Sequence, residues 1–425
     1  MRMKIHYLFP LLAVIACGSG KEEGGRMPWG DDLDGKDDKP AAAGYEVGAV
    51  LPAWEKGCLD IHAINSGRGE CYLYILPDGT TLLVDAGEVT AVGVENIQRK
   101  PDEATRPYVT YSRYIKHFLP EGKTKLDYMY LTHFHIDHMG EDNAAHPRNA
   151  AGYRTVGVSG VFEEVGFTTL LDRGYPSYGE DKTILAPESS ATNNYIAFVR
   201  HATAQKGLKA ERIEVGSDSQ VRLLTDPSYD CRLLNIVGNG RYVTRDGSGN
   251  RIVEQQTIDG ENPASCGFHL QYGKFDCIAC GDLTSAPQNR MAYYYRDFVG
   301  SLEVFKANHH LSANSWGSQM QKNAFSPRVI LNESFSNYQP DKGLLQSILT
   351  GQFENNTYVW TKDIFLTNAH ADLLGEYPDL FRQTQYNGHI VVRVAPGGNE
   401  FMVYMLGDAD FEYRIKSIHG PFKCH

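Results

Sequence analysis

From residue 59 onward, apolar side chains recur in short runs that alternate with polar ones, a pattern typical of half-buried β-strands. In the first part of the chain these runs cover residues 59–64, 70–76 and 80–85. The turn-forming sequence Pro77-Asp78-Gly79 separates the second run from the third, so we expect a hairpin there. The pattern therefore predicts that the folded domain opens with antiparallel sheet.

Residues 108–119 instead place their apolar side chains at helical spacing, which predicts a helix. A strand over 126–131 follows and ends directly before a run of histidines. Between 141 and 220 helical and turn-like pieces alternate, with a helix expected over 194–205. Because functional residues often lie on loops at strand ends, the histidine run is well placed to form a site.

The second half of the chain returns to a strand pattern. The polar, glycine-rich segment 238–260 interrupts it and predicts an exposed loop or a small insertion. Two of the strands are expected to pair across Gly273-Lys274. The predicted strands cover residues 221–224, 232–237, 266–272, 275–280, 302–307, 329–331, 364–366, 389–394 and 401–406.

The order of these elements, strands then helices and then strands and helices again, predicts an α/β fold of two sheets with helices outside. The sequence contains no internal repeat of the length found in repeat proteins. One catalytic domain over 47–425 is therefore the simplest division of the folded part.

The first residues have the layout of an export signal, with Arg2 and Lys4 before an apolar run that ends at Ile15. Ala16-Cys17 closes that run in a pattern that resembles a bacterial lipobox, so we expect 1–17 to be a lipoprotein signal peptide. Cys17 would then carry a lipid that anchors the protein to a membrane of the bacterial envelope, outside the cytoplasm. The alternative is an ordinary signal peptide in which Cys17 is incidental.

Residues 18–46 are rich in Gly, Lys, Asp and Glu and poor in apolar side chains, so they cannot form a core of their own. We interpret them as a flexible tether, with an interaction tail as the alternative.

The whole chain has 425 residues, of which 42% are hydrophobic, and this composition excludes disorder of the entire chain. Its net charge of −11 argues against tight binding of duplex nucleic acid.

Eight cysteines are present, and seven remain once Cys17 is assigned to lipid. An odd remainder excludes complete internal pairing. Cys277 and Cys280 form a C-x-x-C within an apolar strand-like run. Their spacing places them on opposite faces of a strand, which favours packing over a redox or metal role.

The main chemical signal is the run His133, His135, Asp137 and His138. On an extended segment the first two side chains point to the same side, and the next two follow on a turn, so four potential ligands converge. Imidazole together with carboxylate suits zinc, iron or manganese better than calcium, which prefers oxygen ligands alone. The sequence therefore predicts a transition-metal site.

The segment Thr132–Gly140, T-H-F-H-I-D-H-M-G, resembles the signature of the metallo-β-lactamase superfamily. The resemblance implies a four-layer αββα sandwich of two mixed sheets with outer helices. It also implies that His133 and His135 hold one metal ion, while Asp137 and His138 hold the other. The cofactor expected from this resemblance is zinc, as one or two ions, with manganese or iron as alternatives.

Further positions resemble other motifs of the same superfamily. Asp85 resembles its first-motif aspartate, which supports the site from a strand end, and Asp282 resembles its bridging carboxylate. His309 and His310 resemble the last ligand motif, in which one histidine would bind metal and the other would orient it or touch substrate. The alternative is that Asp85 and Asp282 simply cap turns, but the order of the motifs favours a functional role.

A narrower resemblance is to the ComEC-type branch, whose extracellular domains are linked to DNA uptake. The segment Asn65–Glu70, the paired histidines and Asn262-Pro263-Ala264-Ser265 carry it. The likeness extends from about residue 59 to residue 315.

The chain departs from the general pattern of the superfamily at two positions. Asn262 stands where the third-motif histidine of two-metal members would fall, so the His133/His135 metal has the weaker ligand set. Leu311 follows the paired histidines where glycine is usual.

The expected function is hydrolysis by a metal-activated water that Asp137 and Asp282 orient. The ComEC-type resemblance favours a phosphodiester or nucleotide-type substrate, and an ester, lactone or β-lactam is the alternative. A different class of hypothesis is a non-catalytic surface lipoprotein with a degenerate metal site, which Asn262 motivates. Expected partners are a small-molecule or nucleotide substrate and, through the lipid, a membrane.

Overall fold

A computed structural model of the chain describes residues 45–90, 96–179, 189–295, 302–315, 327–350 and 363–425. The predicted signal peptide, Cys17 and all but the last two residues of the predicted tether lie outside these ranges. Among the described residues, no helix is long and apolar enough to cross a membrane.

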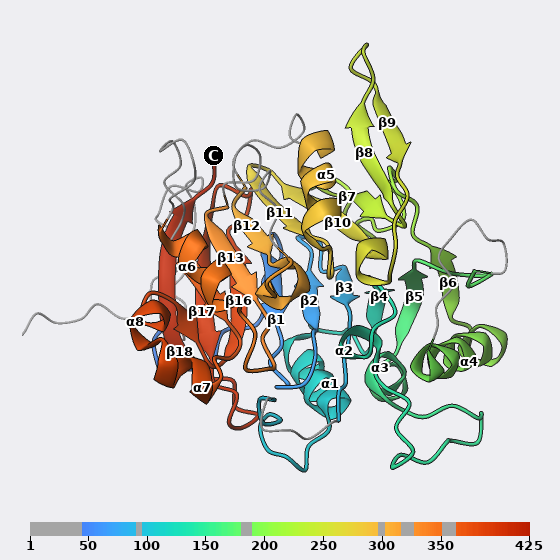
Figure 1. Cartoon of the computed structure of the whole chain (residues 1–425), viewed down its shortest axis with the longest axis horizontal. Helices are drawn as coiled ribbons and strands as arrows, with labels where there is room; N and C mark the ends of the chain where they lie inside the picture. Colours follow the sequence, from blue (N-terminus) through green and yellow to red (C-terminus); the bar gives the residue numbers. More distant parts are fainter. Residues whose placement is uncertain (1–44, 91–95, 180–188, 296–301, 316–326, 351–362) are drawn as a thin grey trace, which may run out of the picture.

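Two nine-stranded sheets form the centre of the molecule (Figure 1). The strand order of the first is β18-β17-β16-β1-β2-β3-β4-β5-β6, antiparallel as far as β3 and parallel from β3 to β6. The strands of this sheet are β1 (Leu59–Ala63), β2 (Tyr72–Ile75), β3 (Thr81–Val84), β4 (Leu126–Tyr130), β5 (Phe167–Asp172), β6 (Lys209–Arg212), β16 (His389–Val394), β17 (Glu400–Leu406) and β18 (Ile415–Lys423).

The second sheet has the order β15-β14-β13-β12-β11-β10-β7-β8-β9 and is parallel from β11 to β15. Both sheets are therefore mixed, as the resemblance in sequence implies. The strands of this sheet are β7 (Cys231–Gly238), β8 (Arg241–Arg245), β9 (Arg251–Gln255), β10 (Gly267–Tyr272), β11 (Phe275–Ala279), β12 (Val304–Lys306), β13 (Val329–Asn332), β14 (Asp363–Leu366) and β15 (Gln385–Tyr386).

Helices connect and cover the strands. They include α2, a single turn that carries part of the histidine run, and two short 3-10 helices beside the candidate site. The helices are α1 (Pro107–Phe118), α2 (Ile136–Met139), α3 (Gly157–Glu164), α4 (Ser190–Gln205), α5 (Ser285–Tyr295), α6 (Lys342–Thr350), α7 (Ala371–Glu376), α8 (Pro378–Phe381), η1 (Asn262–Ala264) and η2 (Asn308–Leu311).

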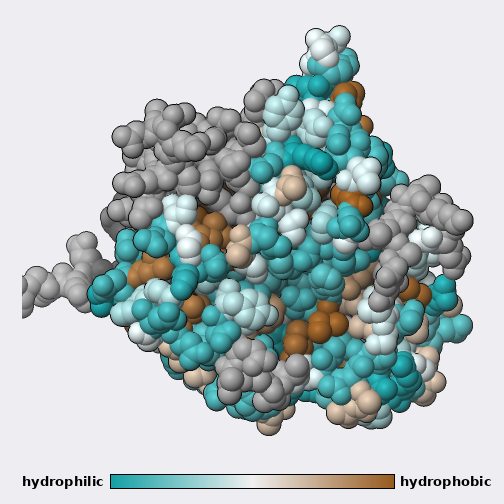
Figure 2. Space-filling view, in the orientation of Figure 1, coloured by the Kyte–Doolittle hydropathy of each residue, from teal (hydrophilic) through white to brown (hydrophobic). Residues whose placement is uncertain are grey.

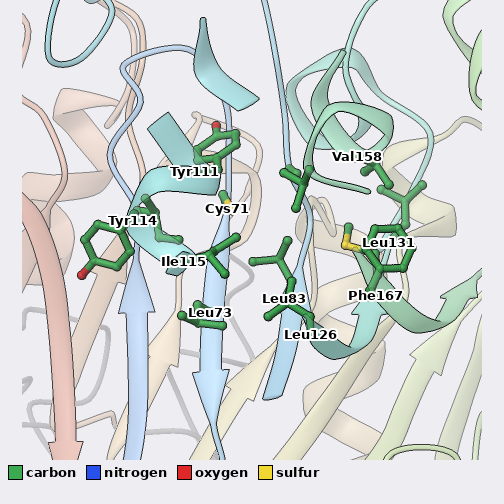
Figure 3. Packing of buried hydrophobic residues seen from close by; sticks show 14 of the residues in the cluster. Cys71, Leu73, Leu83, Tyr111, Tyr114, Ile115, Leu126, Leu131, Val158 and Phe167 are labelled. Atoms are coloured by element: carbon green, nitrogen blue, oxygen red, sulfur yellow. The ribbon is translucent and has the colours of Figure 1, made fainter. Parts of the chain in front are cut away.

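Three buried apolar clusters define four layers. The first joins the first sheet to α1, α3 and α4, and Figure 3 shows Tyr111, Tyr114 and Ile115 of α1 packed over Leu73 and Leu83. The second cluster lies between the two sheets, and the third joins the second sheet to α5, α6, α7 and α8. Because alternate residues of one strand enter different clusters, the period of two in the sequence accounts for the layering. The predicted α/β sandwich is confirmed.

The C-x-x-C pair illustrates this alternation. Cys277 points into the cluster between the sheets, whereas Cys280 points into the cluster beneath the outer helices. Both thiols are buried and neither forms a disulfide. Burial raises the pKa of both thiols, so they remain protonated and pack as small apolar groups.

One prediction about local structure is wrong. Residues 221–224 form no strand, because the Leu224 backbone N–H donates to Thr80 Oγ1 instead of to a neighbouring strand. Segment 238–260 agrees with the small insertion that was expected as the alternative to a loop, since β8 and β9 form a hairpin that projects from the molecule (Figure 1). Tyr242 of β8 is buried, and its ring contacts Tyr294 of α5, a long-range partner that the local pattern does not reveal.

The surface agrees with the polar character of the connecting segments. The face shown in Figure 2 is largely hydrophilic, and its apolar residues gather in small separate patches.

Helix α4 begins at Ser190, earlier than predicted, because the Ser189 side chain accepts a hydrogen bond from the Thr192 backbone N–H and caps the helix.

Candidate metal centre

The predicted ligands follow the carboxyl ends of parallel strands. The histidine run follows β4, Asp282 follows β11, and the paired histidines follow β12 in η2. Asp85 follows β3, the neighbour of β4 in the first sheet. In α/β proteins with parallel strands, this edge is where ligands usually bind.

One group of ligand atoms, which we name the inner position, comprises Asp137, His138, Asp282 and His310. His138 Nε2 lies 3.2 Å from Asp282 Oδ1 and 3.8 Å from Asp137 Oδ2. His310 Nε2 lies 3.5 Å from Asp282 Oδ2 and 3.3 Å from Asp137 Oδ2. Ligand atoms around a tetrahedral Zn²⁺ with bonds of about 2.0–2.1 Å are roughly 3.3 Å apart, so the spacing suits such an ion.

Several of these atoms are buried without a suitable partner. In the described part of the chain, His138 Nε2, His310 Nε2 and Asp282 Oδ1 have no hydrogen-bond partner of acceptable geometry. An unsatisfied buried polar atom costs about 1–3 kcal/mol, and a structure rarely contains several that face one another. A bound cation would satisfy all three atoms, so the donor set fits a metal ion.

The opposite ring nitrogen of each inner histidine is anchored. His138 Nδ1 lies 2.7 Å from Asp85 Oδ2, and His310 Nδ1 lies 3.0 Å from the Glu333 backbone oxygen. Since each Nδ1–H donates to an oxygen, the lone pair of each ring resides on Nε2, which faces the inner position. Asp85 also accepts from the Thr132 backbone N–H at 2.8 Å, so its predicted supporting place agrees with the geometry.

Glu70 also lies within reach of the cluster. Its carboxylate, with His138, Asp282 and His310, forms a group whose candidate ligand atoms lie within 4.8 Å of one another. However, Glu70 approaches the Nδ1 atoms, at 3.9 Å for His138 and 3.3 Å for His310, on the side away from Nε2. Asp137 approaches the Nε2 atoms and is therefore the better inner ligand.

Glu70 instead belongs to a buried charged network behind the ligands. Its Oε1 lies 2.6 Å from Lys306 Nζ, which also donates to the Gly281 backbone oxygen at 2.9 Å. Glu333 accepts from the Cys71 backbone N–H at 2.7 Å. Burial raises the pKa of both Glu70 and Glu333. The network fixes the backbone immediately before Asp282.

The second group, which we name the outer position, comprises His133, His135 and Asp282. His133 Nε2 lies 3.2 Å from His135 Nδ1 and 3.8 Å from Asp282 Oδ2. His133 Nδ1 lies 3.1 Å from Thr132 Oγ1, which donates its own hydrogen to Asp85. The His133 lone pair therefore also resides on Nε2, directed at Asp282, and the two positions share that carboxylate.

The charges at the inner position balance one another. Burial lowers the pKa of His138, but the carboxylates of Asp282 and Asp85 outweigh burial and hold this pKa well above its usual value. Burial acts on His310 in the same way, and Asp282 outweighs it to raise the pKa to about 10. Burial raises the pKa of Asp282, but the two histidines hold it well below the usual range. In the metal-free protein, protons on the imidazoles take the place of a cation.

Close backbone packing holds α2 in place. A Cβ atom on Gly87 would lie 1.7 Å from the Asp137 backbone oxygen, so only glycine fits there. The Ala86 N–H donates to the His138 backbone oxygen at 2.8 Å, and the Glu70 N–H donates to that of Asp137 at 2.8 Å. The loop after β3 thus fixes the helix that carries two of the ligands.

The structure brings all the predicted ligands and Asp85 to one edge, and places Asn262 beside His309. Sequence reasoning assigned no role to Glu70, Thr132, Lys306 or Glu333. A role for Lys306 could have been predicted from the sequence, because a lysine inside an apolar strand needs a buried partner of opposite charge. The unusual Leu311 adopts φ 55°, a left-handed conformation that explains why glycine would be favourable there.

No family model matches the sequence, and no curated protein sequence does. Among solved structures, a protein described as a metal-dependent hydrolase from Parabacteroides distasonis ATCC 8503 matches at 11% identity and a TM-score of 0.31, over 72% of this chain and 92% of that one. The short form of human tRNase Z matches at 10% identity and 0.29, over 77% and 91%.

A variant of the CmlA beta-hydroxylase matches at 10% identity and a TM-score of 0.37. The match covers 81% of this chain and 55% of the hydroxylase. At these identities and scores the three similarities do not assign the chain to a family. The geometry of the site is therefore the basis for a functional conclusion.

Proposed function

We propose that this chain is a metal-dependent hydrolase whose reaction takes place at the inner and outer positions. The observation that carries the proposal is the convergence of buried, unpartnered His138 Nε2, His310 Nε2 and Asp282 Oδ1. Asp137 and His310 at 3.3 Å complete a set of nitrogen and oxygen ligands suited to zinc, iron or manganese.

A metal ion held there would lower the pKa of bound water toward neutrality and polarise the bond to be hydrolysed. The protein residues supply position and charge. Asp137, whose side chain is 19% exposed, and the shared Asp282 orient the attacking water. Asp85 and the Glu333 backbone oxygen keep the two inner imidazoles in the tautomer that presents Nε2.

For the substrate we propose a phosphodiester or nucleotide-type molecule. A cavity of about 920 Å³ is lined by Arg68 and Lys100 together with residues 368–371, which follow the carboxyl end of β14. Its size suits a small molecule, and cationic side chains suit a phosphate group. Arg68 and Lys100 also contact Glu103 and Asp408, so the cavity is not uniformly positive. An ester, lactone or β-lactam is the alternative substrate class.

Turnover of model substrates tests the proposal. Full-length protein stripped with chelator and reloaded with zinc or manganese should hydrolyse bis-p-nitrophenyl phosphate, and His138→Gln should abolish this activity. The matched control His425→Ala, whose side chain is 61% exposed at the chain end, should keep it. Equal turnover by stripped protein, or by His138→Gln, would contradict the proposal. Parallel assays with an ester, a lactone and a β-lactam distinguish the substrate classes.

We further propose that Cys17 carries a lipid that anchors the enzyme to a membrane of the bacterial envelope. The support is the sequence pattern of residues 1–17 alone. Metabolic labelling with a radioactive fatty acid should mark the wild-type protein and leave Cys17→Ala unlabelled. Equal labelling of both would exclude lipidation at this residue.

A further inference from the structure

The outer position has a gap in its ligand set. His133, His135 and the shared Asp282 supply one atom each, and Asn262 stands where a further histidine is expected. The neutral side-chain amide of Asn262 is a poor ligand for the transition metals that imidazole binds well. Three protein ligands and water can hold zinc, but a carboxylate shared between two ions is only partly available to each.

His309 lies beside the carboxylate that the two positions share. Its Nε2 lies 3.9 Å from Asp282 Oδ2, the oxygen that lies 3.8 Å from His133 Nε2, and 3.2 Å from Asn262 Nδ2. Its side chain is 22% exposed, so it lies at the rim of the cluster, whereas His310 is fully enclosed. His309 is thus next to the shared Asp282 and to Asn262, the residue at the position of the absent histidine.

The tautomer of His309 is also fixed. His309 Nδ1 lies 2.9 Å from Asn314 Oδ1, which can only accept, so Nδ1 carries the hydrogen and Nε2 the lone pair. The Asn262 amide donates to that lone pair in this structure. Asn262 Oδ1 is buried without a hydrogen-bond partner among the described residues. The Asn262 amide therefore occupies the direction in which His309 Nε2 would bind a metal ion, and the amide itself is not a strong metal ligand.

The backbone of η2 separates the two neighbouring imidazoles. His309, His310 and Leu311 all adopt positive φ, at 47°, 54° and 55°. Left-handed conformations of residues other than glycine cost about 1–3 kcal/mol each and cluster at functional sites. The result is that the two rings lie 6.3 Å apart at 60° to each other, far enough to serve two different ions.

We propose that the adjacent histidines are divided between two metal ions: His310 binds at the inner position, and His309 completes the outer position with His133, His135 and Asp282. His309 thereby substitutes for the histidine absent at residue 262. This inference rests on the proposed metal-dependent function and specifies its second ion.

Cobalt binding to chelator-stripped, full-length protein tests this assignment independently of activity. Visible absorption follows Co²⁺ binding, and elemental mass spectrometry counts the bound ions. The key variant is His309→Asn, because asparagine tolerates the left-handed backbone at this residue. The matched control is His425→Ala, which removes a histidine remote from the cluster.

Wild type and His425→Ala should each bind two equivalents of Co²⁺. His309→Asn should keep one tight equivalent, which also reports an intact fold, and bind the second more than about 100-fold more weakly, because loss of a direct ligand exceeds the roughly 10- to 100-fold effect of a supporting contact. Two equivalents with unchanged affinities in His309→Asn would overturn the inference. A single equivalent in wild type would overturn it as well, while leaving the proposed function intact; no bound cobalt would contradict both.

Discussion

Two of the regions in which the molecule buries charge, the Arg393 pair and the metal centre, differ in how their polar atoms are satisfied. At Arg393 the guanidinium donates to both Asp60 oxygens at 2.9 and 2.6 Å, to Tyr45 Oη at 2.9 Å and to the Pro52 backbone oxygen at 3.0 Å. In the metal centre, by contrast, buried Nε2 and carboxylate atoms face one another without suitable hydrogen-bond partners in the described residues.

The difference separates a structural role from a functional one. A buried ion pair whose guanidinium makes four hydrogen bonds fixes a local conformation without a bound ion. Ligand atoms that converge at spacings near those of a tetrahedral ion, without hydrogen bonds of acceptable geometry, instead suit a cation that displaces the imidazole protons. The comparison predicts that the Arg393 region matters for stability and the cluster for metal binding.

The largest effect is expected from Asp282→Asn. Asp282 contributes to both positions, and an amide removes the charge that holds the two ions together. Turnover of a phosphodiester should fall by a factor on the order of 10³ or more, and bound metal should drop below one equivalent. Elemental analysis and initial rates measure both quantities. Wild-type metal content in this variant would remove Asp282 from the site.

Arg393→Met should have the next largest effect, and on stability alone. It leaves Asp60 buried and uncompensated, which should cost about 3–5 kcal/mol in urea unfolding followed by circular dichroism. The double variant Arg393→Met/Asp60→Leu removes both charges and should recover most of this loss. Metal content of the folded protein should be unchanged. A loss of bound metal in folded Arg393→Met would contradict the claim that the Arg393 region contributes to stability and not to metal binding.

A smaller effect is expected from Asp85→Asn. Asp85 orients His138 through Nδ1 and receives two hydrogen bonds from Thr132 without touching the inner position itself. Loss of such a supporting contact typically weakens metal binding by about 10- to 100-fold. Competition with a chromophoric chelator measures the change. An effect as large as that of Asp282→Asn would instead indicate that Asp85 binds metal directly.

Metal affinity should also rise with pH. The pKa values of His138 and His310 are raised in the metal-free protein, so both imidazoles are protonated near neutrality and a metal must displace their protons. Raising the pH removes this competition and should strengthen binding by about tenfold per pH unit for each proton released. Zinc titrations between pH 6 and pH 8 measure the slope. Affinity that is independent of pH would contradict the charge balance described for the inner position.

Much of the fold could be predicted because its strands alternate between two buried faces. Hairpin β2–β3, helix α1 and strand β4 agree with the sequence pattern. Residues 221–224 were mispredicted because Thr80 Oγ1 accepts the Leu224 N–H and the Asp78 carboxylate accepts that of the adjacent Thr225. The hairpin β8–β9 was missed because its buried face depends on α5, which is distant in sequence.

In the candidate site, too, some residues could be predicted from local spacing, whereas others depend on contacts between distant parts of the sequence. The ligands next to one another in sequence, from His133 to His138, follow from spacing alone. Glu70 and Glu333 do not, because Glu70 pairs with Lys306 and Glu333 accepts a hydrogen bond from the Cys71 backbone N–H, and both contacts join residues far apart in the sequence. The roles of His309 and His310 also require the left-handed backbone of η2, which histidine and leucine do not favour.

Anomalous diffraction from crystals of the full-length protein grown with zinc tests the central claim most directly. The account predicts a peak bound by His138 Nε2, His310 Nε2, Asp137 and Asp282, with a second peak across Asp282 beside His133 and His135. A zinc-saturated crystal with no peak between His138 and His310, or with its peak at Glu70 instead, would contradict it.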